Sequence, residues 1–313
     1  MNEQLLLTSD QEYELAFEDA RFNTSHMDCR ERAIMRLKRA AERSERFYHQ
    51  PLLVCYSGGK DSDTVLELAK ESGIDFEVVH SHTTADAPQT VYHVREKFAQ
   101  LEEIGIHCFI EYPYYLGERT SMWKLIPQKK LPPTRIVRYC CDVLKETSGD
   151  HRACATGVRW AESAKRKNNR GVNEAISKNA ERRIILNNDN DDTRKLEERC
   201  ILHAKTLVNP IIDWSDKDVF GYLRDRKVDL NPLYSCGFNR VGCIGCPMAG
   251  IHRYDEFRMF PKYKDLYIRS FQKMIEVNKN TKSYQWKSGL ECFDWWMGED
   301  PNQITLFDEF EED

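Results

Sequence analysis

An apolar run, a glycine turn and a helix start follow one another directly, and this succession constrains the fold more than any other feature. The run Leu52–Tyr56 has the length and character of a buried strand, and the segment Ser57–Ser62, SGGKDS, follows it at once. Two glycines let a backbone approach an anion closely, and a helix presents its positive end to such an anion. Lys60 adds a full positive charge. The segment therefore predicts a phosphate-binding strand–turn–helix.

Two simpler interpretations explain this segment less well. A Walker A loop needs a glycine where Val54 stands and a serine or threonine where Asp61 stands. A glycine-rich turn without function fits the backbone pattern but leaves the lysine and both serine hydroxyls unexplained. The segment resembles instead the SGGxDS pyrophosphate loop of the PP-loop ATP pyrophosphatases and the related phosphoadenosine phosphosulfate (PAPS) reductases.

Strand and helix patterns alternate after the loop. The expected elements are helices near 62–70 and 88–104 and strands at 76–79 and 107–110. This alternation predicts an α/β fold, a Rossmann-like parallel sheet with flanking helices. Ligands of such sheets bind beyond the carboxyl ends of the strands, where Ser57–Ser62 and His80–Asp86 both lie.

Composition divides the chain into four expected parts. They are an N-terminal helical segment (1–50), an α/β domain with a basic, mobile insertion near 161–195 (51–213), a smaller, mostly helical, cysteine-bearing region (214–298) and an acidic tail (299–313). A core strand is expected at 207–212, and Ser215 is expected to cap the helix after it. Four arginines lie largely off the apolar stripe of the first helix, which predicts a solvated basic face: Arg32, Arg36, Arg39 and Arg43.

The overall composition indicates a soluble, cytoplasmic protein. Of the 313 residues, 41% are hydrophobic and 31% are charged, and the net charge is −5. An acidic chain of this kind lacks the overall positive charge that indiscriminate nucleic-acid binding needs, so any contact with nucleic acid is expected to be local. We expect no membrane association, because no stretch is apolar enough to span a bilayer and the N-terminus lacks signal-peptide features.

Eleven cysteines would be unusual as disulfides in the cytoplasm, so clustered ones suggest a metal or redox site. The metal-ligand candidates are Cys140, Cys141, Cys236, Cys243 and Cys246. Two thiolates three residues apart around a glycine can converge on one metal or cluster edge. A C-x-x-C alone could also be a redox dithiol. Five cysteines in three places favour a cluster, with structural zinc as the second metal to consider.

Three further segments strengthen the resemblance to the PAPS reductase family. Arg138–Lys145 resembles the cysteine-pair motif of cluster-bearing sulfonucleotide reductases, Asn231–Pro247 resembles their downstream motif, and Gly157–Ser163 resembles their GVRxxES nucleotide segment. The resemblance implies an adenine nucleotide α-hydrolase-like fold and a [4Fe-4S] cluster. The family's ligands correspond to Cys140, Cys141, Cys243 and Cys246. Cys236 stays a candidate to replace one of the adjacent pair.

Two departures from the reductases favour ATP as the substrate. Reductases carry a degenerate phosphate loop, whereas this chain keeps the full form at Ser57–Ser62. They also attack sulfur with the cysteine of a Glu-Cys-Gly-Leu-His element, whereas Cys292 here precedes Phe293 and stands near two tryptophans, which predicts a buried thiol. The favoured hypothesis is an ATP pyrophosphatase that adenylates a substrate for sulfur transfer. The alternatives are a PAPS or adenosine phosphosulfate reductase releasing sulfite, and a non-catalytic nucleotide-binding module.

The hypothesis assigns roles to individual residues. Lys60, with the backbone amides of the loop, would hold the leaving pyrophosphate. Arg159 would hold the α-phosphate, and Asp61 or Asp86 would position Mg²⁺, although Asp61 fits a helix cap equally well. We therefore predict Lys60, Asp61 and Arg159 as catalytic. The predicted nucleotide-binding residues are Ser57, Gly58, Gly59, Lys60, Asp61, Ser62, Thr84, Asp86, Gly157 and Arg159.

The resemblance also suggests partners. Sulfurtransferases of DNA phosphorothioation and some tRNA thiolation enzymes pair this loop with a cluster, which implies a nucleic-acid substrate and a cysteine desulfurase as the sulfur donor. The tail Gln303–Phe307, QITLF, resembles the peptide by which DNA-metabolising proteins dock on bacterial sliding clamps. An apolar tail that folds back on its own domain fits equally well. If the clamp interpretation holds, the basic stretch 165–183 is a candidate contact for DNA phosphates.

Overall fold

The expected parallel sheet is present, and it has more strands than the alternating segments predict. The computed structural model describes residues 27–176, 183–186, 205–280 and 283–298. Within these residues a seven-stranded sheet has the strand order β3-β2-β1-β6-β9-β7-β8. Its strands are β1 (Leu52–Cys55), β2 (Phe76–Ser81), β3 (Cys108–Glu111), β6 (Ala153–Ala155), β7 (Asn173–Ile176), β8 (Arg183–Leu186) and β9 (Lys205–Val208).

The central strands run parallel, which confirms the α/β prediction. β1 pairs in parallel with both β2 and β6, and β6 pairs in parallel with β9. Leu52, Leu53 and Val54 of β1 are each at most 1% exposed. A strand of a parallel sheet is covered on both faces, so a continuous apolar run is the pattern it requires.

The described residues belong to two compact units, each built from separate chain segments. The first unit takes its residues from Met1–His80, Tyr92–Phe109 and Gly149–Val241, and the second from Ser81–Val91, Ile110–Ser148 and Gly242–Asp313. Residues 214–241 therefore belong with the sheet. The division interleaves the chain instead of following a single boundary near residue 214.

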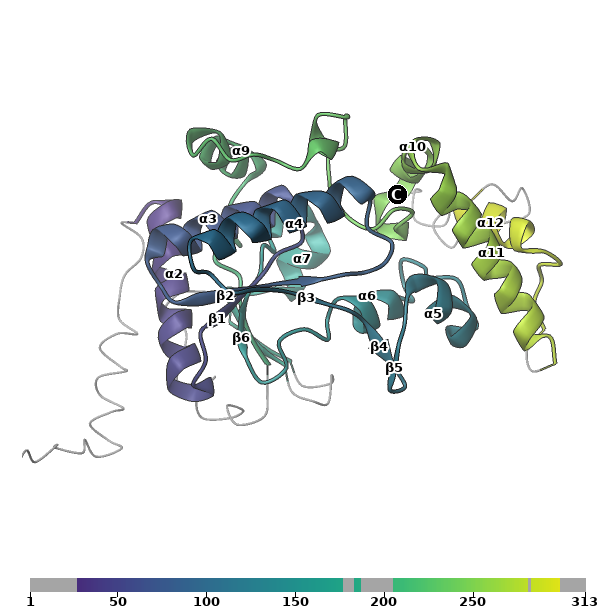
Figure 1. Ribbon diagram of the computed structural model, residues 1–313, viewed down its shortest axis with the longest axis horizontal. Helices are drawn as coiled ribbons and strands as arrows, with labels where there is room; N and C mark the ends of the chain where they lie inside the picture. The colour runs from purple at the N-terminus through teal and green to yellow at the C-terminus, as the bar shows by residue number, and fades with distance from the viewer. Residues whose placement is uncertain (1–26, 177–182, 187–204, 281–282, 299–313) are drawn as a thin grey trace, which may run out of the picture. The chain divides into compact units, whose positions relative to one another are not determined.

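Helices flank the sheet of the first unit. They are α2 (Cys29–Arg43), a π-helical turn (Ser44–Tyr48), α3 (Lys60–Ser72), α4 (Pro88–Glu103, of which residues 92–103 are in this unit), α7 (Ala164–Asn169) and α9 (Asp216–Asp225), with 3₁₀ turns at Trp160–Glu162 and Pro232–Tyr234. α3 and α4 lie along the same side of the sheet (Figure 1). α3 connects β1 to β2 and α4 connects β2 to β3, so the chain moves across the sheet in one direction. Right-handed crossovers in one direction place their helices on the same face of a sheet.

The helix α2 does not have the solvated basic face that its sequence suggests. Arg36 is 5% exposed, and its Nη1 donates hydrogen bonds of 2.8 Å to both Pro210 O and Asp213 Oδ1. Arg32 Nε reaches the same carboxylate at 3.3 Å. The prediction is wrong for Arg36 because a partner 177 residues away lets its charge be buried.

The insertion expected near 161–195 contains ordered structure that sequence reasoning missed. β7 pairs antiparallel with β9 and with β8, so it extends the sheet at its edge. Glu174 of β7 is fully buried and accepts hydrogen bonds from Arg170 Nε (2.7 Å) and Asn209 Nδ2 (2.8 Å). The described strand before residue 209 ends at Val208, and residues 210–213 form a turn in place of the expected strand end.

The second unit is largely helical, as expected for the cysteine-bearing region. Its elements are the hairpin β4 (Tyr114–Tyr115) and β5 (Glu118–Arg119), helices α5 (Met122–Lys129), α6 (Tyr139–Leu144), α10 (Arg253–Met259), α11 (Pro261–Asn278) and α12 (Gly289–Met297), and a 3₁₀ helix (Pro247–His252). α11 packs against α5 and α12. A Cβ at Gly289 would lie 2.3 Å from Ile268 O, so only glycine permits this close approach of α12 to α11.

Candidate functional site

The phosphate loop has the conformation that its sequence predicts. Gly58 has φ +76°, a left-handed conformation that favours glycine, and Gly59 is the N-cap of α3. The Ser62 hydroxyl donates to Gly59 O (2.7 Å) and accepts from Gly59 N (3.1 Å). Ser57 Oγ donates to the same hydroxyl at 3.2 Å. The two serines therefore lie together inside the turn at the start of α3.

A charged network surrounds the first turn of α3. Lys60 is 8% exposed, and its Nζ lies 2.9 Å from Asp61 Oδ2 and 3.6 Å from Asp216 Oδ1. Arg159 Nε donates to Asp61 Oδ1 at 2.7 Å, and Arg159 Nη2 donates to Asp216 Oδ1 at 2.7 Å. The hydrogen bond from Arg159, helped by the nearby charges, lowers the pKa of Asp216. Two cations and two carboxylates thus face one another at the loop.

The contacts of this network bear on the roles predicted for Asp61, Arg159 and Gly157. Asp61 is not a helix cap, because Gly59 occupies that position and both Asp61 oxygens accept from cations. Arg159 is 1% exposed and also donates to Trp214 O at 3.1 Å, so the described contacts make it a group that orients Asp61 and Asp216. A Cβ at Gly157 would lie 2.8 Å from the Asp61 carbonyl carbon, which makes Gly157 a close-approach glycine.

The segment 231–234 holds the loop from a second side, and sequence reasoning assigned it no role. Asn231 is fully buried, and its Nδ2 donates to Gly58 O at 3.0 Å. Lys60 N donates to the Tyr234 hydroxyl at 2.9 Å. The only sequence signal was the resemblance of this segment to the family's downstream motif. A loop residue's carbonyl and a helix-start amide are therefore fixed by a segment more than 170 positions away.

A buried polar cluster lies directly behind the loop. The Tyr56 hydroxyl donates to Asp63 Oδ1 at 2.7 Å and lies 3.1 Å from His93 Nε2. Because its one proton goes to the carboxylate, Tyr56 must accept from His93, which fixes the Nε2–H tautomer. Burial raises the pKa of Asp63 to about 6, and it lowers the pKa of His93 to about 4. Nothing in the local sequence pattern pointed to this cluster.

Four of the five candidate metal ligands belong to the second unit. Cys140 and Cys141 start α6, and Cys243 and Cys246 flank a tight turn centred on Gly245. Gly245 has φ +74°, and a Cβ there would lie 2.5 Å from the Phe257 ring. Cys236 belongs to the first unit, where it is exposed.

The four thiols are close enough to influence one another's ionisation. The pKa of Cys140 is raised by its hydrogen bond with Cys141, by burial and by the thiols of Cys243 and Cys246. The pKa of Cys141 falls to about 6, because of the bond from Cys140 and because Lys145 and Arg138 are near. Arg138 Nη2 lies 3.2 Å from Cys141 Sγ. A set of converging thiols with adjacent cations fits a thiolate-ligated cluster or zinc.

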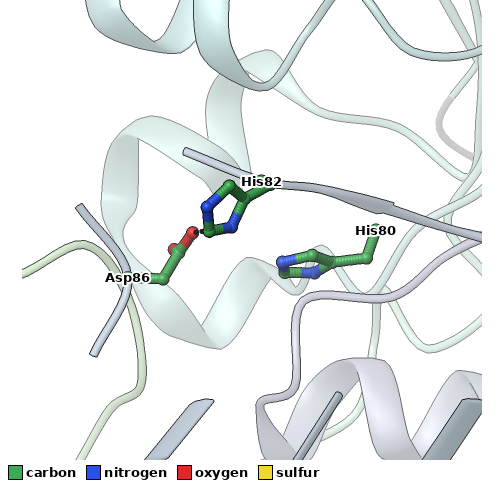
Figure 2. Close-up of side chains that lie close together, drawn as sticks. All are labelled: His80, His82 and Asp86. Atoms are coloured by element: carbon green, nitrogen blue, oxygen red, sulfur yellow. Dashed lines mark ion pairs between the residues drawn. The ribbon is translucent and has the colours of Figure 1, made fainter. Parts of the chain in front are cut away.

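The loop after β2 is joined to the cysteine turn in the second unit. Asp86 and Cys243 form an isolated β-bridge, and Ile244 N donates to Ala85 O at 2.8 Å. Asp86 Oδ2 accepts from Thr83 N at 2.8 Å and lies 3.5 Å from His82 Nδ1, a pair shown in Figure 2. The figure also labels His80, which ends the first unit's part of β2 and whose Nδ1 lies 2.9 Å from Tyr56 O.

The predicted nucleotide residues are thus divided between the units. Ser57–Ser62, Gly157 and Arg159 lie in the first unit, and Thr84 and Asp86 lie in the second. Thr84 has φ +65°, and its hydroxyl accepts from Met122 N at 2.8 Å. The nucleotide-binding and Mg²⁺-binding roles of all these residues stay predictions.

Cys292, whose sequence surroundings suggested a comparison with the reductase nucleophile, is fully buried in α12. Burial raises the pKa of its thiol. The prediction of a buried thiol is therefore confirmed. The tail Gln303–Phe307 lies outside the described residues. Residues 177–182 of the basic stretch 165–183 lie outside them too. Among those that are described, no helix has the length and apolar character needed to cross a membrane.

Comparisons with known proteins point to one family. The family model described as "Phosphoadenosine phosphosulfate reductase domain" matches residues 51–249. An uncharacterized protein of Methanocaldococcus jannaschii is 28% identical over 226 residues, which are 68% of this chain and 40% of that protein. The chain thus spans less than half the length of this relative.

Two further similarities involve named enzymes. An adenosine 5′-phosphosulfate reductase of Bacillus cereus is 22% identical over 213 residues, which are 64% of this chain and 75% of that enzyme. A crystal structure of a PAPS reductase from Candida auris aligns with a TM-score of 0.42 and 14% identity, covering 76% of this chain and 96% of that one.

Proposed function

Because the chain belongs to the phosphoadenosine phosphosulfate reductase domain family, we propose that it is an ATP pyrophosphatase of that family that prepares a substrate for sulfur transfer. The observation that carries the choice between ATP and a sulfonucleotide is the burial of Cys292. A reductase needs an accessible thiolate to attack sulfur, and a fully buried thiol with a raised pKa cannot supply one.

The charged loop supports ATP as the substrate. Splitting ATP between its α and β phosphorus atoms releases pyrophosphate, so the enzyme must neutralise the charge that develops on that leaving group. Lys60, at the positive end of α3, is suited to this task, and the amides of Gly58 and Gly59 adjoin it. The hydroxyl groups of Ser57 and Ser62 lie within the same turn.

The proposed reaction has two displacements. An oxygen of the acceptor attacks the α-phosphorus of ATP, the bond to the bridging oxygen breaks, and pyrophosphate leaves with that electron pair. A sulfur nucleophile then attacks the activated carbon or phosphorus of the acceptor, and AMP leaves with the oxygen. Arg159 holds Asp61 in place through the 2.7 Å bond to its Oδ1. Asp61 is our candidate for orienting Mg²⁺ on the phosphates.

The cysteine site suits a [4Fe-4S] cluster held by Cys140, Cys141, Cys243 and Cys246. When bound, such a cluster would supply a sulfur-carrying or structural centre. Arg138, whose Nη2 lies 3.2 Å from Cys141 Sγ, supplies a cation that stabilises the thiolate that a ligand must be. Iron and acid-labile sulfide assays on anaerobically purified protein test this assignment, and colourless protein with stoichiometric zinc would contradict it.

We further propose that the acceptor is a nucleic acid, as in sulfurtransferases of the DNA phosphorothioation type, with a cysteine desulfurase as the sulfur donor. The support comes from the sequence: the full phosphate loop combined with the cysteine set, and the clamp-like tail at Gln303–Phe307. Docking on a sliding clamp through that tail belongs to the same proposal. Replacing Leu306 and Phe307 with Ala should abolish clamp binding if it is correct.

Release of pyrophosphate from ATP tests the proposed chemistry. Lys60→Ala should abolish release, whereas Cys292→Ser should retain it, because the buried thiol is not used. The second candidate function, reduction of a sulfonucleotide, is favoured by the similarity to the Bacillus cereus reductase. It predicts sulfite release that Cys292→Ser abolishes. Sulfite production without pyrophosphate release would replace the first proposal with the second, and nucleotide affinity without either product would indicate a binding module.

A further inference from the structure

The stretch 112–138 of the second unit has a charge balance opposite to that of the whole chain. It holds six Lys and Arg and one Glu, a formal charge of +5, whereas the chain carries −5. Five of its six cationic side chains are exposed: Arg119, Lys124, Lys130, Arg135 and Arg138. An exposed, locally basic stretch on an acidic protein is the electrostatic feature expected of a restricted polyanion contact.

The β4–β5 hairpin presents flat side chains on one face of this stretch. Tyr114 pairs directly with Arg119, so their side chains share a face of the hairpin. The Arg119 guanidinium carbon lies 3.8 Å from the centre of the Tyr112 ring, which places Tyr112 on the same face. Tyr114 is 61% exposed and Tyr112 is 37% exposed. Two tyrosines and a stacked guanidinium thus form an exposed row.

This row continues toward the cysteine turn within the second unit. The His82 ring meets Tyr112 edge-on, with the ring centres 5.6 Å apart. His82 in turn faces the Asp86 carboxylate, as Figure 2 shows, and the backbone of Asp86 bridges to Cys243. A chain of contacts therefore connects the exposed tyrosines with the proposed cluster ligands.

The other face of the hairpin meets one basic side chain of α5. Lys129 Nζ lies 4.2 Å from the centre of the Tyr115 ring. Lys129 is followed by the exposed Lys130 at the end of the helix. The hairpin therefore carries an aromatic row with Arg119 on one face and meets the Lys129 cation on the other, an arrangement suited to a ligand that has both flat and anionic parts.

We propose that the face formed by Tyr112, Tyr114 and Arg119 is a stacking platform for an unpaired stretch of DNA. Unpaired bases expose faces that can stack on tyrosine and arginine, while their phosphates are attracted by the exposed cations of the stretch 112–138. The base faces of a duplex are stacked on one another inside it, so a duplex could interact only with the positively charged side chains. DNA is the polymer to which the clamp-like tail points. The inference rests on the proposed nucleic-acid acceptor and locates where that acceptor binds.

Fluorescence anisotropy with a labelled, mixed-sequence single-stranded DNA oligonucleotide tests the platform, using the full chain without ATP. Tyr114→Ala and Tyr112→Ala should each weaken binding by about 5-fold or more, the range found when one stacking aromatic is removed. Tyr114→Phe should bind as the unmodified protein does, because stacking needs the ring and not the hydroxyl. Lys130→Ala should lower the slope of log K against log salt by about 0.7, as expected for one lost phosphate contact.

Matched controls separate the platform from general surface effects. Tyr92→Ala removes a tyrosine that is 70% exposed in the first unit, and Arg258→Ala removes an exposed arginine of the second unit. Both should bind the oligonucleotide normally. The proposal is overturned if the unmodified protein does not bind the oligonucleotide, or if the platform variants bind like the controls. A duplex bound as tightly as the single strand, or an RNA of the same sequence bound at least about tenfold more tightly, would also overturn it.

The same measurement distinguishes this inference from the proposed chemistry. Lys60→Ala is expected to lose pyrophosphate release while keeping oligonucleotide affinity, because Lys60 is not one of the side chains that form the platform. Normal DNA binding in a chain that never releases pyrophosphate would refute the enzymatic proposal and support the platform. Pyrophosphate release by a chain that does not bind DNA would refute the platform and support the enzymatic proposal.

Discussion

Replacing His93 with Gln should make the protein progressively less stable as the pH rises from about 4 to about 6. Burial raises the pKa of Asp63 from 3.8 to about 6 and lowers that of His93 from 6.5 to about 4. Between these values the unfolded chain holds one proton, on His93, and the folded chain also holds one, on Asp63. The pair therefore adds no pH dependence to the free energy of unfolding.

Each of two substitutions, His93→Gln and Asp63→Asn, removes one of the two groups whose opposite pKa shifts cancel. A raised carboxyl pKa means that stability is lost as the pH rises, so His93→Gln exposes a slope of about −1.4 kcal/mol per pH unit, or about 3 kcal/mol over the interval. A lowered imidazole pKa has the opposite sign, because stability is gained as the pH rises. Asp63→Asn should therefore expose a slope of about +1.4 kcal/mol per pH unit.

Urea unfolding followed by tryptophan fluorescence across this pH interval measures both slopes. The informative quantity is the difference between variant and unmodified protein, since the other ionisable groups titrate alike in both. Opposite slopes of similar size are expected for the two variants. If both variants follow the pH profile of the unmodified protein, Asp63 and His93 do not exchange a proton on folding and the reasoning is refuted.

Two further predictions concern the turns that shape the sites. Gly245→Ala should unfold the cysteine turn and abolish metal binding, because its Cβ would lie 2.5 Å from Phe257. Gly237 has a similarly positive φ, but a Cβ there would meet nothing within 4 Å. Gly237→Ala should therefore lower the free energy of unfolding by only about 1–2 kcal/mol. Metal content per chain measures the difference, and equal metal loss in both would contradict it. Asn231→Ala should weaken pyrophosphate binding and cost about 1–3 kcal/mol, because Gly58 O loses its donor. Asn278→Ala, which removes a comparable buried bond to Pro127 O, should cost stability without changing titrated pyrophosphate affinity.

Local patterns were sufficient to predict the first strands and helices. The run at Leu52–Val54 is apolar because both faces of β1 are covered, and the positive φ of Gly58 in the turn favours a glycine there. The helix predicted at 88–104 is found at Pro88–Glu103. These features depend on neighbours within a few residues, and those neighbours are visible in the sequence.

Features that depend on distant partners were missed. Arg36 looked like a surface charge because Asp213, which neutralises it, is 177 positions away. β7 looked like part of a polar insertion, because the partners of its buried Glu174 include Asn209. The Tyr56–Asp63–His93 cluster was invisible for the same reason, since its histidine comes from another helix.

The sequence alone determined the phosphate loop, the parallel sheet and the set of cysteines, because each is written in adjacent residues whose chemistry and spacing have few alternative uses. Tertiary structure decided what those residues do. It paired Lys60 and Arg159 with Asp61 and Asp216, it buried Cys292, and it gathered two distant cysteine pairs into one unit. Burial and charge pairing are properties of what surrounds a side chain, and only the folded chain brings those surroundings together.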